Sequence, residues 1–510
     1  MTMVRLYTMQ AWHVASKTVH TLRYATKPGY RSWPGDTPAS EVFLPLVLRP
    51  AEVSVSIAEP GEARGQTRVD LGRLVMDNAF DRQFNSRPLN PLLTDYVVAG
   101  WPIIEQVVRR DQPLSTAVTT FRGVMEMPEP ERGSLTIPVR GRELDFDRAL
   151  LTETYPGTGG LGGPSDLTDK TKERIIGHVA VIEPTYLGVI GGLNTYSLNG
   201  GHPIDDVLWF RDRAAQLTRV AGTPAMDQWS VDLSTAILRV GGDRPEAPTC
   251  EVRGDKTGGV YRRHAGAVLA WIASDLTGLR TAEDIDLASV AVLDAAPRTV
   301  GLWCPAGQSP TARDALDRIA GSLWGGYWLE GALGIFRVGR LPAVGGTVKA
   351  NYRKGAGTDP LKPRSDSRRS LPASKVTWRY ARNYAVSQTL AAQAADAAAT
   401  RAKAEWLEVA TDEDDDVVAA YRAAARHEVI ESVLIDPADA AAEAALAAVD
   451  LATPHRTFEL RPWDRAPGLD LTDEIAVTDD IAGFEAGGRL VIIGRSINDR
   501  SGKATLIGRT

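Results

Sequence analysis

The chain has 510 residues, and its 64 acidic and 58 basic side chains give a formal net charge of −6. This balance argues against a protein that coats nucleic acid with a large basic surface. Two cysteines, Cys250 and Cys304, are too few for a disulfide framework or a cysteine-rich metal site, and no run of about 18 apolar residues predicts a membrane span.

Strands are predicted through the first half of the chain, where short apolar or alternating runs are separated by Gly, Pro, Asn and Asp. Residues 53–57 alternate with period two, as a half-buried strand does. Residues 135–139 alternate as well, and Pro138 predicts an edge strand because proline lacks the N–H of a central ladder. Five glycines and two prolines at 155–164 predict an ordered turn or a mobile loop.

The pattern changes after Gly254. Residues 266–276 read as a helix, and a second helix is expected at 309–323, where Ser309-Pro310 supplies a cap followed by Pro at the first helical position. A hairpin is expected at 326–338, with its turn near Glu330-Gly331. Together these elements predict a small α/β domain.

Residues 351–382 form a basic stretch with nine Lys or Arg and two Asp, which we interpret as a connector, and a new strand is expected to start at 376–380. Trp378 and Tyr380 suggest stacking on nucleic-acid bases, although a solvated linker or a subunit contact is favoured by the acidic total. Residues 389–449 are Ala-rich and predicted to be helical, with a capped start at Asp436-Pro437. Strands are expected again from 457 to the end.

No catalytic, cofactor-binding or metal-ligating residues are predicted. Residues 427–431 resemble a zinc-protease helix but lack the second His, so we expect a surface helix. The loop at 157–163 lacks the Gly-Lys-Ser/Thr of a phosphate loop, and the acidic run at 412–416 lacks the spacing of a calcium loop and is typical of a helix start. Cys304 has no His nearby in sequence, so we expect no enzyme with a cysteine nucleophile, and no other catalytic pattern predicts one. No cofactor is expected either.

Several motifs, taken in chain order, resemble the baseplate hub (tail tip hub) proteins of long-tailed bacteriophages and of phage-derived gene transfer agents. Residues 71–78 resemble a family strand that ends in Asn beside an acidic turn, and residues 121–124 carry its Phe-x-Gly pattern. Residues 144–149 and the Tyr-x-Gly-x-Gly-Gly loop at 155–163 resemble its most recognisable stretch, and residues 177–184 continue as the family does. Residues 487–495 resemble its closing β hairpin, so the resemblance spans roughly 400 residues.

The resemblance implies a multidomain, β-rich α+β fold. Two tube-like β modules are expected, with an inserted small α/β domain and an Ala-rich helical segment between their parts. The predicted division is an N-terminal tube-like β module at 1–170, a second β module at 171–255, the small α/β domain at 256–345, and a C-terminal tube-like β module with Ala-rich helices at 346–510.

The resemblance also implies a structural hub of the virion tail tip. Three chains are expected to form a homotrimeric ring that closes the tail tube, anchors tip proteins and surrounds the DNA ejection channel. Expected partners are the distal tail protein, the tape-measure protein and tail fibre or spike proteins of the same particle, which is assembled in the host cytoplasm, with phage DNA passing transiently. Two distant cysteines and only seven His argue against the fused peptidase or cysteine-ligated cluster that some hubs carry.

Two other functions stay open. A receptor- or carbohydrate-binding tail tip protein requires exposed aromatic side chains in a shallow groove, whereas an envelope-opening hydrolase requires an activated nucleophile such as Cys304. Tryptophans at strand and helix spacing are more often core residues than sugar platforms. The six tryptophans in question are Trp209, Trp229, Trp271, Trp303, Trp324 and Trp328.

Overall fold

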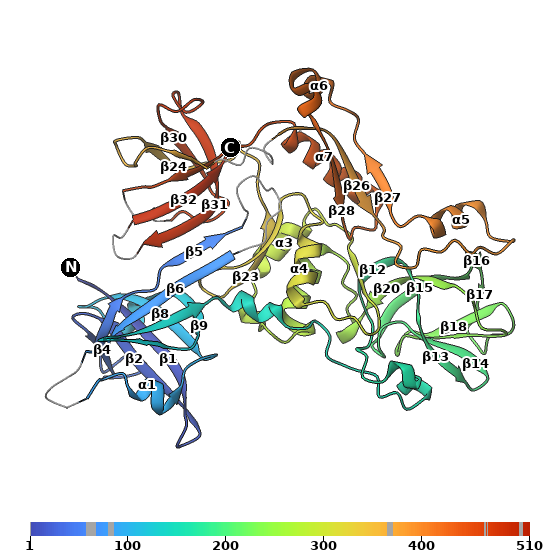
Figure 1. Cartoon of the computed structure of the whole chain (residues 1–510), viewed down its shortest axis with the longest axis horizontal. Coiled ribbons are helices and arrows are strands. Elements are labelled where there is room, and N and C mark those ends of the chain that lie inside the picture. Colours follow the sequence, from blue (N-terminus) through green and yellow to red (C-terminus); the bar gives the residue numbers. More distant parts are fainter. Residues whose placement is uncertain are drawn as a thin grey trace.

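The computed structural model is β-rich, with a closed barrel, several smaller sheets and a few short helices (Figure 1). The α+β class and the multidomain organisation expected from the sequence are confirmed. The structure describes residues 2–57, 68–79, 86–364, 371–463, 466, 468–498 and 503–510.

Seven strands near the N-terminus close into a barrel, because each pairs with its neighbours in the order β1-β2-β4-β6-β11-β9-β8 and β8 returns to β1. All these pairs are antiparallel except β2–β4. Its interior is filled by side chains with no exposed surface, such as Tyr7, Met9, Leu74, Phe121 and Ile137. The strands are β1 (Met3–His13), β2 (Thr18–Thr26), β4 (Val42–Arg49), β6 (Arg68–Asp77), β8 (Pro102–Arg109), β9 (Val118–Met125) and β11 (Ser134–Arg140).

Pro138 lies within the barrel, so the prediction of an edge strand is wrong. Strand β11 pairs with β6 on one side and with β9 or the short β10 (Glu129–Glu131) on the other. The register against β6 shifts between Pro138 and Arg140, which places the residue without an N–H at an irregularity of the ladder. The carbonyl of Pro138 still accepts a hydrogen bond from the Glu126 N–H at 2.9 Å.

A sandwich of two five-stranded sheets follows. One sheet has the order β16-β15-β20-β12-β21 and the other the order β13-β14-β19-β18-β17. Tyr196, Phe210 and Trp229 fill the space between them. The strands are β12 (Arg174–Ile182), β13 (Thr185–Ile190), β14 (Leu193–Ser197), β15 (Ile204–Asp212), β16 (Ala215–Gln216), β17 (Thr218–Arg219), β18 (Gln228–Asp232), β19 (Ile237–Val240), β20 (Pro248–Asp255) and β21 (Gly301–Cys304).

An α/β unit lies between barrel and sandwich (Figure 1). The predicted hairpin is confirmed as β22 pairing antiparallel with β23. The predicted helix at 309–323 is shorter, because Thr311 rather than Ser309 is its N-cap and forms a capping box with Asp314. The elements are α2 (Ala265–Trp271), α3 (Leu287–Asp294), α4 (Ala312–Ala320), β22 (Gly326–Glu330) and β23 (Phe336–Arg340).

The basic stretch at 351–382 contains strand at 351–353, 362–364 and 373–380, so the strand predicted at 376–380 is confirmed and the interpretation of the stretch as a connector is wrong for the described residues. Trp378 has no exposed surface and Tyr380 is 9% exposed, which excludes both from stacking on bases. They lie on β26, the centre of a three-stranded sheet with order β27-β26-β28. The strands are β24 (Val348–Arg353), β25 (Lys362–Arg364), β26 (Ala373–Tyr380), β27 (Leu407–Ala410) and β28 (Arg426–Glu431).

The Ala-rich segment is only partly helical. Residues 427–431, expected in a surface helix, belong to β28, which pairs in parallel with β26. The acidic run does start a helix, because the Asp414 side chain caps α6 by accepting the Val417 N–H at 3.0 Å. The helices are α5 (Asp396–Lys403), α6 (Asp415–Tyr421) and α7 (Pro437–Leu451).

Helix α7 packs against β26 through small side chains, and Ala440, Ala444 and Ala447 are buried. Its predicted start is confirmed, because the Asp436 side chain accepts the Ala438 N–H at 2.8 Å and Pro437 follows.

Replacement of Asp436 by Ala is expected to lower the free energy of unfolding by about 1 kcal/mol, because the first turn of α7 loses its cap. Urea denaturation followed by circular dichroism measures this change. Asp243→Ala is the matched control, since Asp243 is exposed and lies outside any helix start, and it should change stability by less than about 0.5 kcal/mol. Equal effects of the two variants would contradict the capping role.

The C-terminal sheet has the order β24-β30-β31-β32-β29-β25. Strand β5 (Val53–Ser56), predicted from its period of two, pairs with β6 of the barrel through Val55↔Val69 and with β31 through Gly494↔Ser56. The barrel and the C-terminal sheet are therefore hydrogen-bonded to each other although roughly 440 residues separate the paired strands (Figure 1). The new strands are β29 (Thr457–Leu460), β30 (Glu474–Thr478), β31 (Gly488–Asn498) and β32 (Lys503–Arg509).

Candidate functional site: a charged junction between barrel, α/β unit and C-terminal sheet

The chain leaves the barrel at Arg140 and at once forms a short 3₁₀ helix, η2 (Arg142–Asp147), that lies against the α/β unit. Phe146 of η2 is fully buried between Trp328 and Phe336, with ring centroids 5.4 and 5.9 Å away. This aromatic anchor fixes η2 on the β22–β23 hairpin, so the polar residues of η2 face the end of that hairpin.

Arg280 is the centre of the junction, and its side chain has no exposed surface. Its guanidinium makes a two-pronged contact with the Glu330 carboxylate, in which Nε donates to Oε1 at 2.7 Å and Nη2 donates to Oε2. It also donates to the carbonyl of Arg142 at 2.7 Å and lies 4.6 Å over the ring of Phe146. This geometry is the planar, bidentate recognition for which arginine is suited.

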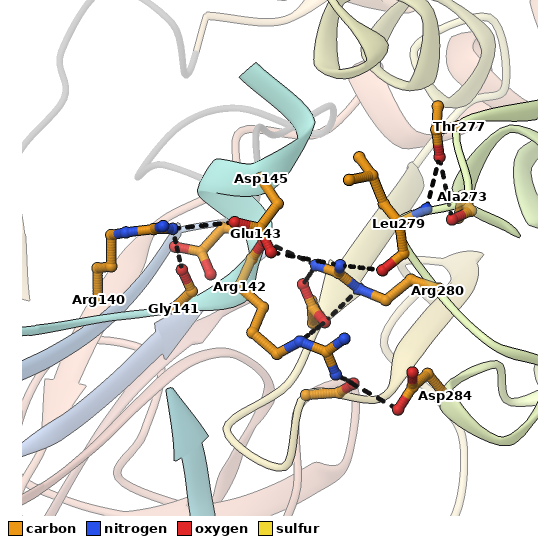
Figure 2. A network of polar contacts seen from close by, with 12 residues as sticks. Arg140, Gly141, Arg142, Glu143, Asp145, Ala273, Thr277, Leu279, Arg280 and Asp284 are labelled. Carbon is orange, nitrogen blue, oxygen red and sulfur yellow. Dashed lines mark hydrogen bonds and ion pairs between the residues drawn. The ribbon is translucent and has the colours of Figure 1, made fainter. Parts of the chain in front are cut away.

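Two further arginines extend the network to the barrel (Figure 2). Arg142 Nη1 lies 3.3 Å from Asp284 Oδ1 in the α/β unit, and its Nε lies 3.9 Å from Glu330 Oε1. Arg140, the last residue of β11, lies 3.2 Å from Asp145 Oδ1. The charges of the barrel end and of the α/β unit thus neutralise one another across the junction.

Glu143 differs from the other charged residues of this network because one of its carboxyl oxygens is buried without a partner among the described residues. It is 4% exposed, and its Oε2 has no hydrogen-bond partner within the described residues. Burial raises the pKa of Glu143 to about 7, and the nearby Glu330 carboxylate adds to this rise while Arg313 and Arg140 oppose it. Gly141 leaves room for this carboxyl, because a Cβ at that position would lie 1.8 Å from Glu143 Oε2.

A cavity of about 510 Å³ adjoins the junction. Its floor is the end of the barrel, where the Glu105 carboxylate is 1% exposed and accepts hydrogen bonds from Arg5 at 2.7 Å, from Thr120 at 2.6 Å and from Tyr7. Its rim holds the Arg337–Asp470 ion pair at 3.0 Å. The walls are apolar and come from β5, from the β22–β23 hairpin and from the segment that precedes β30. The residues are Val53, Val55, Leu329, Leu333, Ile335, Leu469 and Leu471.

The residues that the sequence singled out for chemistry lie apart from this junction. Cys250 and Cys304 are buried, and burial raises the pKa of both thiols, that of Cys304 to about 12. His427 Nε2 contacts Thr377 Oγ1 at 2.8 Å on the three-stranded sheet. The glycine loop is an ordered turn, closed by Gly157 N–H to Gly162 O at 3.0 Å.

Among the described residues, no three His, Cys, Asp or Glu side chains are grouped to hold a metal ion, and no helix is long and apolar enough to span a membrane. Trp229, Trp303 and Trp328 are at most 5% exposed and fill cores, as the packing interpretation predicts. Arg280, Glu330 and Glu143 were not identified from the sequence, where nothing distinguishes them from surface charges.

No protein-family model matches this chain, and no curated protein matches it. It is similar to a solved 43 kDa tail protein of prophage MuSo2 from Shewanella oneidensis, with 11% identity, a TM-score of 0.37, and 92% of this chain and 96% of that chain covered. A tail protein from Neisseria meningitidis MC58 has 10% identity and a TM-score of 0.41, with 99% and 96% covered. A chain of a native gene transfer agent virion has 14% identity and a TM-score of 0.40, with 67% and 84% covered.

The identities and TM-scores of these solved structures are low, so the function of this chain is argued below from its own residues.

Proposed function

We propose that this chain is a structural protein of a phage-type tail, without catalytic activity, and that it forms the hub of the tail tip. The observation that carries the proposal is the pairing of β5 with both β6 and β31. It joins two β modules from opposite ends of the chain into one continuous hydrogen-bonded unit. The two tube-like modules that the sequence resemblance implies, at 1–170 and 346–510, would be held side by side in this way.

The junction supports a structural role. Modules of one chain usually move relative to one another unless their interface is large and hydrophobic, and here Phe146 of η2 is buried against Trp328 and Phe336. Here Arg280, fully buried, bonds to Glu330 of its own unit and to the Arg142 carbonyl of η2, while Arg142 reaches Asp284. Such contacts fix the orientation of the barrel on the α/β unit, as suits a structural component of a tail.

The finer parts of the proposal follow from the resemblance. Three chains would contribute six β modules to a ring that continues the tail tube and surrounds the DNA ejection channel. The distal tail protein, the tape-measure protein and fibre or spike proteins would be its partners in the virion. A receptor- or glycan-binding role is the alternative, and it would require a shallow aromatic groove on the surface of the assembled ring.

Electron cryo-microscopy of purified particles tests the proposal. We expect three copies of this chain in a ring directly below the tail tube, and a purified chain whose mass by light scattering is three times 55.0 kDa. Absence of the chain from the particle, or its location only on peripheral appendages, would overturn the hub. Glycan binding by the isolated chain together with a peripheral location would favour the receptor role.

A further inference from the structure

Helix α7 lies beside the C-terminal sheet (Figure 1), and the side chain of His455 connects the two. His455 Nε2 lies 2.7 Å from the backbone oxygen of Asp450, a residue of the last turn of α7. Carbonyls of the last turn have no partner within their own helix, so a side-chain donor satisfies one of them here. His455 Nδ1 lies 2.5 Å from the backbone oxygen of Thr510, which directly follows β32.

This arrangement requires a protonated imidazole. A backbone oxygen accepts hydrogen bonds and cannot donate one, and both ring nitrogens of His455 face such an oxygen. A neutral imidazole donates through only one nitrogen, so the lone pair of its other nitrogen would face the second oxygen. The imidazolium satisfies both contacts, and its positive charge also suits the C-terminal end of a helix.

The side chain of Asp450 supplies the counter-ion. Its Oδ1 lies 3.2 Å from His455 Nε2, and its Oδ2 accepts hydrogen bonds from Arg509 Nη2 at 2.6 Å and from Trp324 Nε1 at 3.2 Å. Burial opposes ionisation, but the contacts with His455 and Arg509 outweigh it and lower the pKa of Asp450 to about 2. The carboxylate therefore joins the end of α7, the end of β32 and the α/β unit at one point.

The groups around the imidazole favour its charged form on balance. Burial and the positive charge of Arg509 disfavour protonation, whereas Asp450 and Thr510 favour it, and the outcome is a raised pKa of His455. Two further cations line the groove beside the ring, but both are paired with the buried Glu443 carboxylate: Arg298 and Arg340.

We propose that His455 is a proton-dependent bridge between α7 and the C-terminal sheet. The protonated ring donates to the backbone oxygens of Asp450 and Thr510 at once. Loss of the proton leaves one nitrogen as an acceptor that faces an oxygen, so one of the two contacts breaks and the end of β32 is released from α7. The bridge is a property of the fold and does not rest on the proposed tail function.

The sign of the pH dependence follows from the raised pKa. The folded chain holds the proton more tightly than the unfolded chain, so the bridge is complete below about pH 6.5, the ordinary pKa of histidine. It is lost as the pH rises through the higher pKa of the folded chain.

Amide hydrogen exchange of the full chain, read by mass spectrometry at about pH 6 and about pH 9, tests the bridge. The N–H groups of Ala452, Arg456 and Thr510 make hydrogen bonds next to it, at 3.0, 2.9 and 3.0 Å. After correction for the pH dependence of exchange in the unfolded chain, peptides that contain these residues should exchange about tenfold faster or more at the higher pH, because a hydrogen bond of a charged group is lost.

A histidine variant and a matched control separate this bridge from other titrating groups. His455→Gln should exchange fast in the same peptides at both pH values. His427→Gln, which removes an exposed imidazole from β28, should behave as the wild-type chain does. The same pH dependence in His455→Gln as in the wild-type chain would overturn the proposal.

Exchange of the imidazole C2 hydrogen gives a second test that needs no variant. Its rate follows the protonation of the ring, and the peptide that contains His455 reports it in the wild-type chain. The midpoint of the rate profile should lie at higher pH in the native chain than in the urea-unfolded chain. A native midpoint at the same or a lower pH would contradict the bridge.

Discussion

The Arg280→Met variant is expected to lose about 3–5 kcal/mol of unfolding free energy, because the buried Glu330 carboxylate loses its bidentate partner. Glu330 is 1% exposed, and its two oxygens accept the Nε and Nη2 hydrogens of Arg280. Met keeps most of the length and volume of the arginine stem, so the loss reports the charge rather than a cavity. Guanidinium denaturation followed by tryptophan fluorescence measures the change in the free energy of unfolding.

Two companion variants separate this pair from other contacts. Arg337→Met removes the ion pairs with Asp470 and Asp286. The Arg337, Asp470 and Asp286 side chains are 42%, 61% and 28% exposed, so the change should cost less than about 1 kcal/mol. Arg280→Met/Glu330→Leu removes both buried charges and should recover much of the lost stability. If Arg280→Met costs no more than Arg337→Met, the junction is not held by this pair.

Elements with a local signal could be predicted from the sequence. Strand β5 follows from its period of two, the β22–β23 hairpin from two apolar runs around a turn, and the start of α7 from Asp436-Pro437. Each of these signals lies within a few residues of the element it defines. The structure therefore agrees with these local predictions.

Strand β28 could not be predicted in this way. Its neighbours in sequence are Ala-rich and favour a helix, whereas its conformation is set by parallel pairing with β26, which lies roughly 50 residues earlier. Val429 and Ile430 are β-branched, which is the only local indication of a strand. Pairing at such a distance overrides the propensity of the segment.

The charged junction illustrates the same limit for the candidate site. The sequence predicts Glu330 at a turn, where a carboxylate is normally solvated, but the residue is 1% exposed and Arg280 binds it from 50 residues away. Glu143 comes from η2, beyond the end of a different sheet. A sequence shows which residues are charged but not which of them are buried. Burial is what makes the pairing of these residues important for stability.

Glu143 also makes the stability of the junction depend on pH. Its pKa rises from the ordinary 4.5 to about 7 in the folded chain, chiefly because burial disfavours the carboxylate. The folded state therefore binds the proton more tightly than the unfolded state. The stabilisation is complete below about pH 4.5 and is lost as the pH rises to about 7, a change of ~3 kcal/mol at about 1.4 kcal/mol for each pH unit.

Glu143→Gln, which is neutral at every pH, is expected to match the wild-type chain at pH 4.5 and to be more stable by about 3 kcal/mol at pH 8. Urea denaturation at the two pH values measures the difference between the two proteins, in which other titrating groups cancel. One such group is His455, whose pKa is raised by its contact with Asp450, although burial opposes that rise. Glu126→Gln, at an exposed position, should show no such pH-dependent difference. A constant difference in unfolding free energy between Glu143→Gln and wild type across this range would mean that Glu143 stays ionised in the junction. The barrel would then be held on the α/β unit by a fully charged network that does not respond to pH.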